Sequence, residues 1–195
     1  MTTTKAGYAG HVFAFAVQVS VSLFVDGAQH EALADEAEAY SKGIGHLTTR
    51  QDMQLYWIPT NDAPLVQARA AAVGLTTREA CGNSVRNVTA CPYAGISPTE
   101  VFDVTKHGDA VTAHFLRNPA SQKLPRKFKI AITGATADRA ATYWHDVGLH
   151  LKKNEAGELG FKVLVGGGMG RTPITGTVIR EFLPWNQIIN YLEAV

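Results

Sequence analysis

A single arginine stands among small polar residues in GNSVRNVTACPYAG, residues 82–95. The segment is dense in Gly, Asn, Ser and Thr, so we predict a loop with Arg86 exposed in it. Arginine carries a planar, permanently charged group that matches a carboxylate or an oxyanion with paired hydrogen bonds. The segment therefore suits anion binding, and a surface arginine in a turn is the alternative interpretation.

Two lysines stand two positions apart in LPRKFKIAITG, residues 124–134. The alternation predicts a strand over residues 127–133, with Lys127 and Lys129 on one face and Phe128 and Ile130 on the other. Like charges side by side repel, so such a strand is either solvated or faces an anion. A solvated edge strand is the commoner of these two cases.

A third candidate is LTTRQDMQL, residues 47–55, in which Arg50 and Gln51 follow two threonines. The surrounding alternation predicts one strand over residues 46–58, bent near Arg50. An arginine beside hydroxyl and amide donors suits the capture of carboxylates at several points.

The fourth candidate is VLVGGGMGR, residues 163–171, where a predicted buried strand runs into Gly166, Gly167 and Gly168 with Arg171 beyond. Glycine-rich turns expose backbone amides that bind anions. The dinucleotide-binding pattern GxGxxG is not completed, because Arg171 replaces its third glycine and Pro173 follows. We reject a dinucleotide fold, and the four candidates together predict a polyanionic ligand held between two domains.

The elements that must position these residues follow from periodicity and from Gly and Pro signals. A change to polar, glycine-rich composition places a domain boundary near residue 76, giving domains over residues 1–75 and 76–195. The fold class is α+β. Strands are predicted at residues 12–25, 46–58, 127–133, 147–152 and 161–165, and helices at residues 28–40, 64–75, 104–117, 138–144 and 184–195.

Composition narrows the class of partner. A net charge of +1 gives no bulk field for nucleic acid or an anionic membrane. The apolar run at residues 11–25 is too short and too polar to span a bilayer, and no secretory signal precedes it, so the cytoplasm is expected. Cys81 and Cys91 fit neither a disulfide scaffold nor a four-ligand metal site, and the seven histidines predict no metal ligands.

The blocks GHLTTRQDMQL, GNSVRNVTACPYAG, LPRKFKIAITG and GFKVLVGGGMGRTP, in this order, resemble the assimilatory sulfite and nitrite reductase family. The resemblance implies a ferredoxin-like half-domain followed by an α/β siroheme-binding half-domain with a mixed sheet. It covers the first half of the family's repeated architecture. The implied activity is the six-electron reduction of sulfite or nitrite, with siroheme as the cofactor.

The same resemblance implies roles for individual residues. Arg86, Lys127 and Lys129 match the cations that bind the substrate oxyanion and relay protons. Arg50 and Gln51 match residues that hold the carboxylates of siroheme. The remaining cofactor-binding residues that it implies are Thr49, Asn83, Gly166, Gly167, Gly168 and Arg171.

Two departures from the family pattern are visible in the sequence. Where members place an arginine on the first strand, this chain has Gln18 and Ser20. The later segment whose cysteines ligate a four-iron four-sulfur cluster has no match here, and Cys81 and Cys91 do not replace it. The implied partners are sulfite or nitrite, a ferredoxin or flavoprotein electron donor, and a cluster-bearing C-terminal half.

The alternative left open is a tetrapyrrole- or anion-binding protein without redox chemistry, or an inactive fragment on the same scaffold. Ferredoxin-like RNA binding is disfavoured because the net charge is near zero and no basic, aromatic strand is present.

Overall fold

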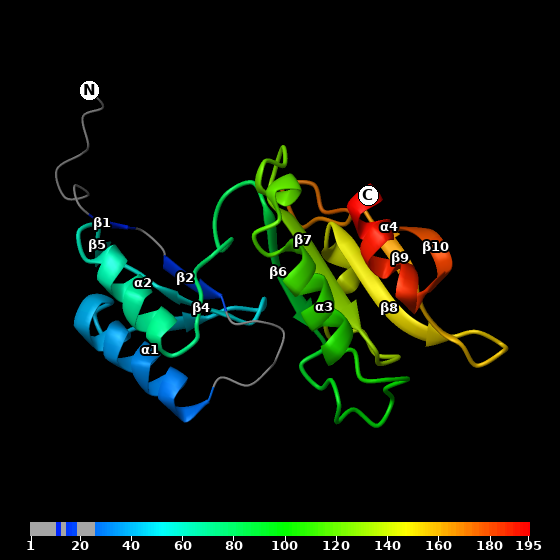
Figure 1. Ribbon diagram of the computed structural model, residues 1–195, viewed down its shortest axis with the longest axis horizontal. Helices are drawn as coiled ribbons and strands as arrows, with labels where there is room; N and C mark the ends of the chain where they lie inside the picture. Colours follow the sequence, from blue (N-terminus) through cyan, green and yellow to red (C-terminus); the bar gives the residue numbers. More distant parts are fainter. Residues whose placement is uncertain (1–10, 13–14, 19–25) are drawn as a thin grey trace. The chain divides into compact units, whose positions relative to one another are not determined.

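A computed structural model describes residues 11–12, 15–18 and 26–195, and the described chain divides after Ala80 into two compact units (Figure 1). We call them unit 1 and unit 2. Of the predicted strand at residues 12–25, β1 (His11–Val12) and β2 (Phe15–Gln18) are strands, and Ser20 lies outside the described residues. Within the described residues, no helix is both long enough and apolar enough to cross a bilayer.

Unit 1 contains a three-stranded antiparallel sheet in the order β2-β4-β3 and two helices. Asp26 begins α1 (Gly27–Tyr40) with a capping box, because its side chain accepts from the Gln29 amide at 2.8 Å while Gln29 Oε1 accepts from the Asp26 amide at 3.0 Å. Pro64 stands in the first turn of α2 (Ala63–Ala72), where its missing N–H costs nothing. Both helices contribute to one apolar core with the strands.

The single strand predicted over residues 46–58 is wrong. The chain forms β3 (Gly45–Leu47), a tight turn, β4 (Asp52–Leu55) and the short β5 (Ile58–Pro59), which pairs with β1. Thr48 Oγ1 accepts from the amides of Arg50 and Asp52 at 3.3 and 3.2 Å, and Gln51 has a left-handed φ of +61°. The threonine side chain closes this turn locally, which an alternation of apolar residues does not reveal.

A buried ion pair joins the two helices of unit 1. Glu36 on α1 is 3% exposed, and its Oε1 lies 3.3 Å from Nη1 of the half-exposed Arg69 on α2. Burial raises the pKa of Glu36, and the hydrogen bond and charge of Arg69 oppose that rise only in part. Keeping this carboxylate ionised in the folded state therefore lowers the free energy of unfolding.

This cost predicts a pH dependence of stability. Because the folded-state pKa of Glu36 lies above its unfolded value, the folded chain binds more protons between the two values, and the free energy of unfolding falls as pH rises through them. Glu36→Gln is expected to flatten that fall in urea unfolding followed between about pH 4 and 8. Glu38→Gln, an exposed site on the same helix, is the control. Parallel pH profiles for the two variants would contradict the assignment.

Unit 2 is built on a five-stranded mixed sheet in the order β10-β9-β8-β7-β6. Strands β6, β7 and β8 are parallel, and β9 and β10 run antiparallel to their neighbours. The bounds are β6 (Val85–Ala90), β7 (Phe128–Thr133), β8 (Val147–Lys153), β9 (Leu159–Val165) and β10 (Thr177–Pro184). Together with unit 1, this sheet confirms the predicted α+β fold class with a mixed sheet in its second part.

One face of the sheet carries the apolar core of unit 2. Helices α3 (Thr105–Phe115) and α4 (Ile188–Ala194) pack against it, through Val111 and Phe115 of α3 and Ile188 and Leu192 of α4 (Figure 1). We call this the core face. The sheet residues that meet the helices include Ile130, Ile132, Val147 and Leu149, so their neighbours along each strand project from the opposite face.

Several predictions for unit 2 are wrong. Residues 82–95 are not a loop throughout, because Arg86 lies within β6. Strand β7 is flanked by β6 and β8, so the solvated edge strand is excluded. The helix at residues 138–144 reduces to the 3-10 helix η2 (Thr142–Trp144). The helix predicted at residues 184–195 is confirmed as α4, and the 3-10 helix η3 (Trp185–Gln187) forms its first part. Strand β10 was not predicted.

Candidate functional site

The predicted cations of unit 2 meet at one end of its sheet. Val85 pairs with Phe128 and Ile130 pairs with Val147, so the amino ends of β6, β7 and β8 lie side by side. Arg86 is the second residue of β6, Lys129 is the second residue of β7, and Lys127 immediately precedes β7. We call this place, with these three cations, the cationic sheet end.

Lys129 projects away from the core. Its neighbours Phe128 and Ile130 pack against or in the apolar core, so alternation puts Lys129 on the opposite face. Arg86 stands at a register shift in β6, between the core residues Val85 and Val88. Arg86 Nη2 donates to the carbonyl of Gly82 at 2.9 Å. Lys127 is exposed, whereas Arg86 and Lys129 are half-buried. Cations held close together in this way favour a bound anion.

The predicted glycine turn lies at the same end of the sheet. Strand β9 ends at Val165, which pairs with Val147 at the start of β8. Beyond it, Gly168 and Ile174 exchange two backbone hydrogen bonds of 2.8 and 2.9 Å, which close a hairpin over residues 166–176. We call this the glycine hairpin. Its tip includes the exposed residues Met169 and Arg171.

Gly167 is enclosed by carbonyl groups. A Cβ atom at this position would lie 2.5 Å from the backbone oxygens of both Tyr143 and His145. The Gly166 amide donates to the carbonyl of Asp146 at 2.9 Å, and Gly166 has a φ of +79° that favours glycine. The close approach of these two backbones explains why the segment needs glycine at positions 166 and 167.

Asn83, in the loop before β6, hydrogen-bonds to the segment that precedes Lys127. Its Nδ2 donates to the Pro125 carbonyl at 3.4 Å, and its own carbonyl accepts from the Leu124 amide at 2.9 Å. The Ser84 carbonyl accepts from the Phe128 amide at 3.0 Å. The structure therefore gives Asn83 a part in building the cationic sheet end, through its backbone and side chain.

Thr49, Arg50 and Gln51 lie together in the turn between β3 and β4 of unit 1. Thr49 is exposed, and Arg50 and Gln51 are half-buried. The turn brings donors of two kinds, guanidinium and amide, to one short stretch of backbone. Such a group can bind carboxylates, as the sequence predicts for these residues.

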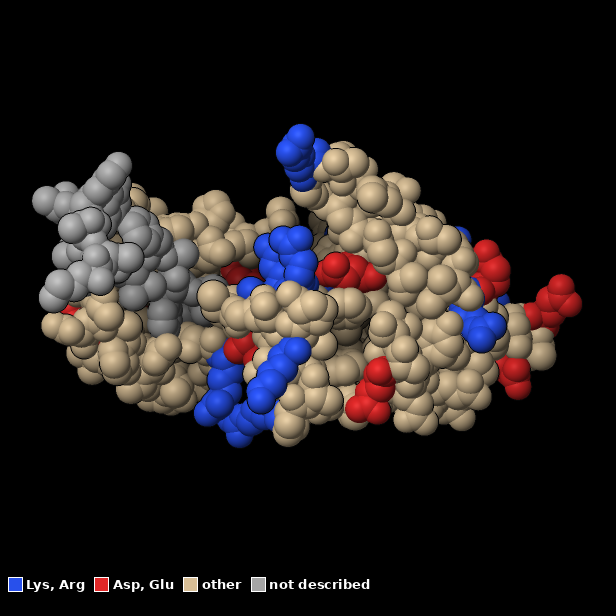
Figure 2. All heavy atoms as spheres, turned by 90° about the horizontal axis from the view of Figure 1, so that it is seen from above, with Lys and Arg blue, Asp and Glu red and all other residues tan. Residues whose placement is uncertain are grey.

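The two ends of the parallel strands differ in charge. Beyond the carboxyl end of β7, Ala135 bridges to Glu100, whose Oε2 accepts from the Gly95 amide at 2.7 Å. Burial raises the pKa of Glu100, while a hydrogen bond from the Thr105 hydroxyl lowers the pKa of nearby Asp103. Figure 2 shows lysine and arginine side chains in local groups, so a chain of near-neutral charge still offers cationic places.

Sequence reasoning missed Asp146, which links β7 to the glycine hairpin. Its Oδ2 accepts from the Lys129 amide at 2.8 Å, and its carbonyl accepts from Gly166. It also missed Asp138, Thr142 and His150, which form a polar cluster close by. The segment ATADRAAT contained a usable signal, because it places Asp138 four residues before Thr142. An aspartate in such a position often accepts hydrogen bonds from nearby backbone amides.

Comparison with known proteins now identifies the family. Residues 81–195 match the family described as nitrite and sulphite reductase 4Fe-4S domain, and residues 9–73 match the nitrite/sulfite reductase ferredoxin-like half domain. The chain belongs to the nitrite and sulphite reductase family. This confirms the resemblance found in the sequence and, for unit 1, the predicted ferredoxin-like half-domain.

Individual members of the nitrite and sulphite reductase family agree. An assimilatory ferredoxin-dependent nitrite reductase of Haloferax mediterranei is 37% identical over 134 residues, covering 67% of this chain and 23% of that protein. A sulfite reductase [ferredoxin] of Mycolicibacterium paratuberculosis is 31% identical, covering 80% and 28%. The NirA protein of Mycobacterium tuberculosis matches 93% of this chain with a TM-score of 0.83 and 26% identity. The chain spans about a quarter of the curated relatives and 33% of NirA.

The residues present fit the two cofactors of the nitrite and sulphite reductase family differently. The three cations of the cationic sheet end suit a ligand rich in carboxylates, as siroheme is. A four-iron four-sulfur cluster needs four thiolates, and the chain has two cysteines, Cys81 exposed and Cys91 buried. Among the described residues, no three His, Cys, Asp or Glu side chains gather as metal ligands. The chain therefore fits the macrocycle and does not fit the cluster.

Proposed function

We propose that this chain forms a siroheme- and substrate-binding wall of a nitrite or sulfite reductase. The observation that carries the proposal is the convergence of Arg86, Lys127, Lys129 and the glycine hairpin on one end of one sheet. These segments lie far apart in the sequence, so only the folded sheet brings them together. Relatives named as nitrite and sulfite reductases support the assignment.

Each residue has a definite part in the proposed chemistry. Arg86 binds an oxyanion through its planar fork, while the ammonium groups of Lys127 and Lys129 neutralise charge and hold protons at Nζ for the oxygen that leaves. Gly166, Gly167 and Gly168 shape the hairpin that would lie beside carboxylates of the macrocycle, with Asn83 and Arg171 as side-chain donors. The amides of Gly166 and Gly168 donate to Asp146 and Ile174, so these glycines act through the shape of the hairpin. Siroheme supplies the electron chemistry when bound.

The proposal also covers the domain boundaries, the electron donor and the partner half of the reductase. We assign the half-domains to residues 1–75 and 76–195, with Thr49, Arg50 and Gln51 of the first binding siroheme carboxylates. Ferredoxin is the proposed electron donor because relatives are named ferredoxin-dependent or carry ferredoxin in their names. A cluster-bearing second half is the proposed partner chain or segment. A cytoplasmic location stays a prediction.

Siroheme added to the purified chain tests the proposal. We expect saturable binding with a shifted visible absorbance, followed by oxidation of reduced methyl viologen when sulfite or nitrite and a cluster-bearing half are supplied. Binding that never supports turnover would favour a tetrapyrrole-binding protein without redox chemistry. Absence of binding would contradict the proposed wall.

A further inference from the structure

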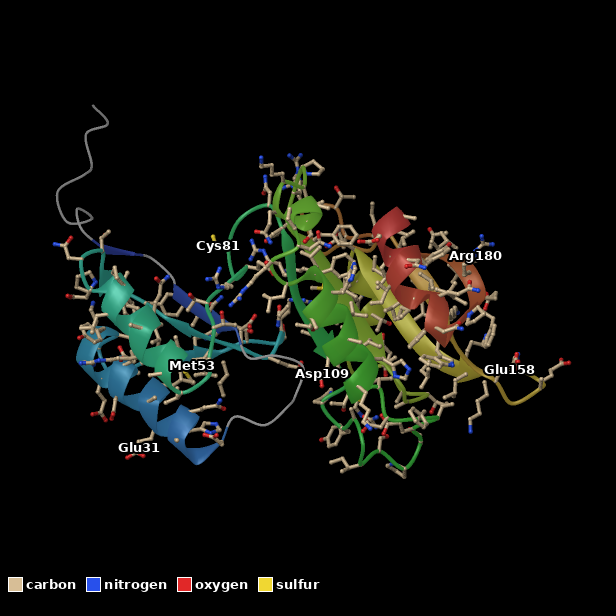
Figure 3. The ribbon with its side chains drawn as sticks, viewed as in Figure 1. Glu31, Met53, Cys81, Asp109, Glu158 and Arg180 are labelled. Atoms are coloured by element: carbon tan, nitrogen blue, oxygen red, sulfur yellow. The ribbon has the colours of Figure 1, made fainter. Side chains whose placement is uncertain are left out.

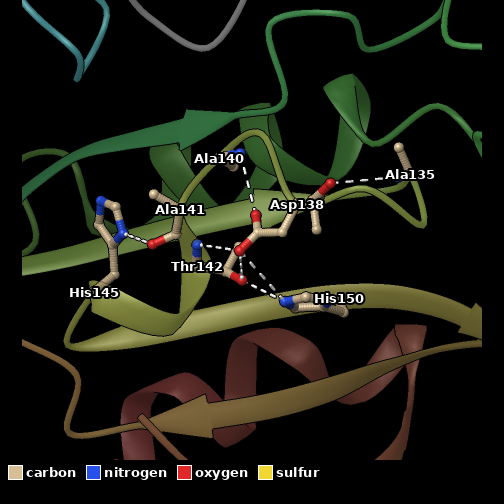
Figure 4. Close-up of polar contacts among 8 residues, drawn as sticks. Ala135, Asp138, Ala140, Ala141, Thr142, His145 and His150 are labelled. Atoms are coloured by element: carbon tan, nitrogen blue, oxygen red, sulfur yellow. Dashed lines mark hydrogen bonds and ion pairs between the residues drawn. The ribbon is translucent and has the colours of Figure 1, made fainter. Parts of the chain in front are cut away.

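A partly buried polar chain lies on the face of the unit 2 sheet opposite the core. Thr142 of η2 is fully buried, and its Oγ1 hydrogen-bonds to Asp138 Oδ2 at 2.8 Å and to Nε2 of His150 on β8 (Figure 4). Asp138 also accepts from the amides of Ala140 and Thr142, at 3.1 and 2.8 Å. The Asp138 carboxylate thus accepts the hydrogen bonds that hold the turn before η2.

The direction of the hydrogen bonds is set by chemistry. A carboxylate only accepts, and the Thr142 hydroxyl has one proton, so that proton goes to Asp138 and the hydroxyl oxygen accepts from His150 Nε2–H. Burial lowers the pKa of His150, and Lys162 acts in the same direction, against the opposing charge of Asp138. A neutral ring with its proton on Nε2 therefore completes the chain from His150 through Thr142 to Asp138.

This network fixes η2 on the sheet. A Cβ atom at Gly148 would lie 2.3 Å from the Thr142 carbonyl oxygen, so the backbone of η2 lies directly on β8. The next residue, Tyr143, uses its carbonyl to accept from the Gly176 amide at 2.7 Å. It also helps to enclose Gly167. Both strands of the glycine hairpin therefore contact the backbone that the network holds.

The same segment reaches the lysine strand. Four residues after Thr142, Asp146 accepts from the Lys129 amide through its side chain and from Gly166 through its carbonyl. Residues 142–146 thus stand between the strand that carries Lys129 and the hairpin that carries Gly166 and Gly167. A shift of this segment would change the spacing between the two ligand-binding elements.

We propose that Asp138, Thr142 and His150 are positioning residues, which hold residues 142–146 so that Lys129 and the glycine hairpin keep a fixed spacing. The purpose of that spacing rests on the proposed function, whereas the mechanical link does not. None of the three is placed in contact with siroheme or substrate. They act through the backbone of η2 and Asp146.

Thr142→Val tests the link, because it keeps the shape of the side chain and removes the hydroxyl. We expect amide hydrogen exchange at Gly166, Gly168 and Gly176 to become about tenfold faster or more, the loss expected when a buried hydrogen-bond partner is removed. The turn at residues 154–158, at the far end of β8 and marked by Glu158 in Figure 3, serves as the internal reference and should not change. Thr142→Ser restores the hydroxyl and should return exchange close to the original rate.

Two results would overturn the proposal. One is equal acceleration at residues 154–158, which means a general loss of stability. The other is unchanged exchange in the hairpin. If Thr142→Val does not fold, Asp138→Asn is measured against the same expectation. The exchange experiment uses the chain without siroheme or substrate, so failure of the proposed function leaves its outcome unaffected. In a separate titration, Thr142→Val should weaken sulfite binding about tenfold while Thr142→Ser does not.

Discussion

Replacing Lys127 and Lys129 together by methionine is expected to weaken sulfite or nitrite binding by on the order of 100-fold or more. A hydrogen bond to a charged group contributes about 1.5–3 kcal/mol, and the double change removes two such donors from the cationic sheet end. Methionine retains an unbranched apolar stem, so packing changes little. Titration calorimetry with each anion measures the effect on the siroheme-loaded chain.

The matched control is the pair Lys152→Met and Lys153→Met. These lysines end β8, at the opposite end of the strand from Val147, and their replacement changes the net charge by the same amount. Lys152 pairs with Glu181 at 3.6 Å, and Lys153 is exposed. We expect this control to bind within about threefold of the original chain, because charges at the far end of the strand are screened. Equal weakening in the two double variants would show that total charge, and not the cationic sheet end, governs binding.

Gly167→Ala is expected to destabilise unit 2 and to disturb the glycine hairpin. Its Cβ would stand 2.5 Å from two backbone oxygens, and neither Tyr143 nor His145 can move its carbonyl without moving η2. Overpacking of this kind costs about 1–3 kcal/mol. For a chain of this size, each kcal/mol lowers Tm by about 2–4 °C, which thermal unfolding followed by circular dichroism can resolve.

Gly170→Ala is the control for this change. It lies in the tip of the same hairpin, and a Cβ there would meet nothing within 4 Å. We expect its Tm to stay within about 2 °C of the original, since surface changes usually alter stability by less than 0.5 kcal/mol. A Tm for Gly167→Ala as high as that of Gly170→Ala would mean that the hairpin does not pack on η2 as described.

Strong periodicity made part of the fold predictable. Strands β7, β8 and β9 and helices α1 and α3 carry continuous or regularly spaced apolar residues, and each lies within a few residues of its predicted place. Helix α2 was recognised from Pro64 and its alanine-rich stripe, although it ends at Ala72, before Gly74. These signals are local, so they survive without knowledge of the partner elements.

Strand β6 was not predicted, because some of its buried residues are polar. Asn87 and Thr89 are 4% and 3% exposed, and a buried asparagine reads from sequence as a loop residue. Strand β10 was not predicted because half of its residues are exposed and only Leu183 is buried. The helix at residues 138–144 failed because Asp138 binds the amides of Ala140 and Thr142, which holds the backbone in a turn.

The candidate site was predictable by residue type and not by geometry. Arg86, Lys127 and Lys129 stand out because cations bind anions, and the glycines stand out because glycine-rich turns often bind anions. Their meeting depends on the register between β6, β7, β8 and β9, which comes from long-range pairing. Asp146 and the network around Thr142 have no such compositional mark, because each works through backbone groups.

The central claim is that the cationic sheet end binds the carboxylates of the macrocycle. Its most direct test is a ¹⁵N NMR titration of the chain with metal-free siroheme, which keeps the carboxylates and avoids iron broadening. We predict that the amides of Arg86, Lys129, Gly166 and Gly168 shift together with one Kd, while those of residues 154–158 do not move. Shifts confined to the far turn, or saturation without any shift at the cationic sheet end, would contradict the account.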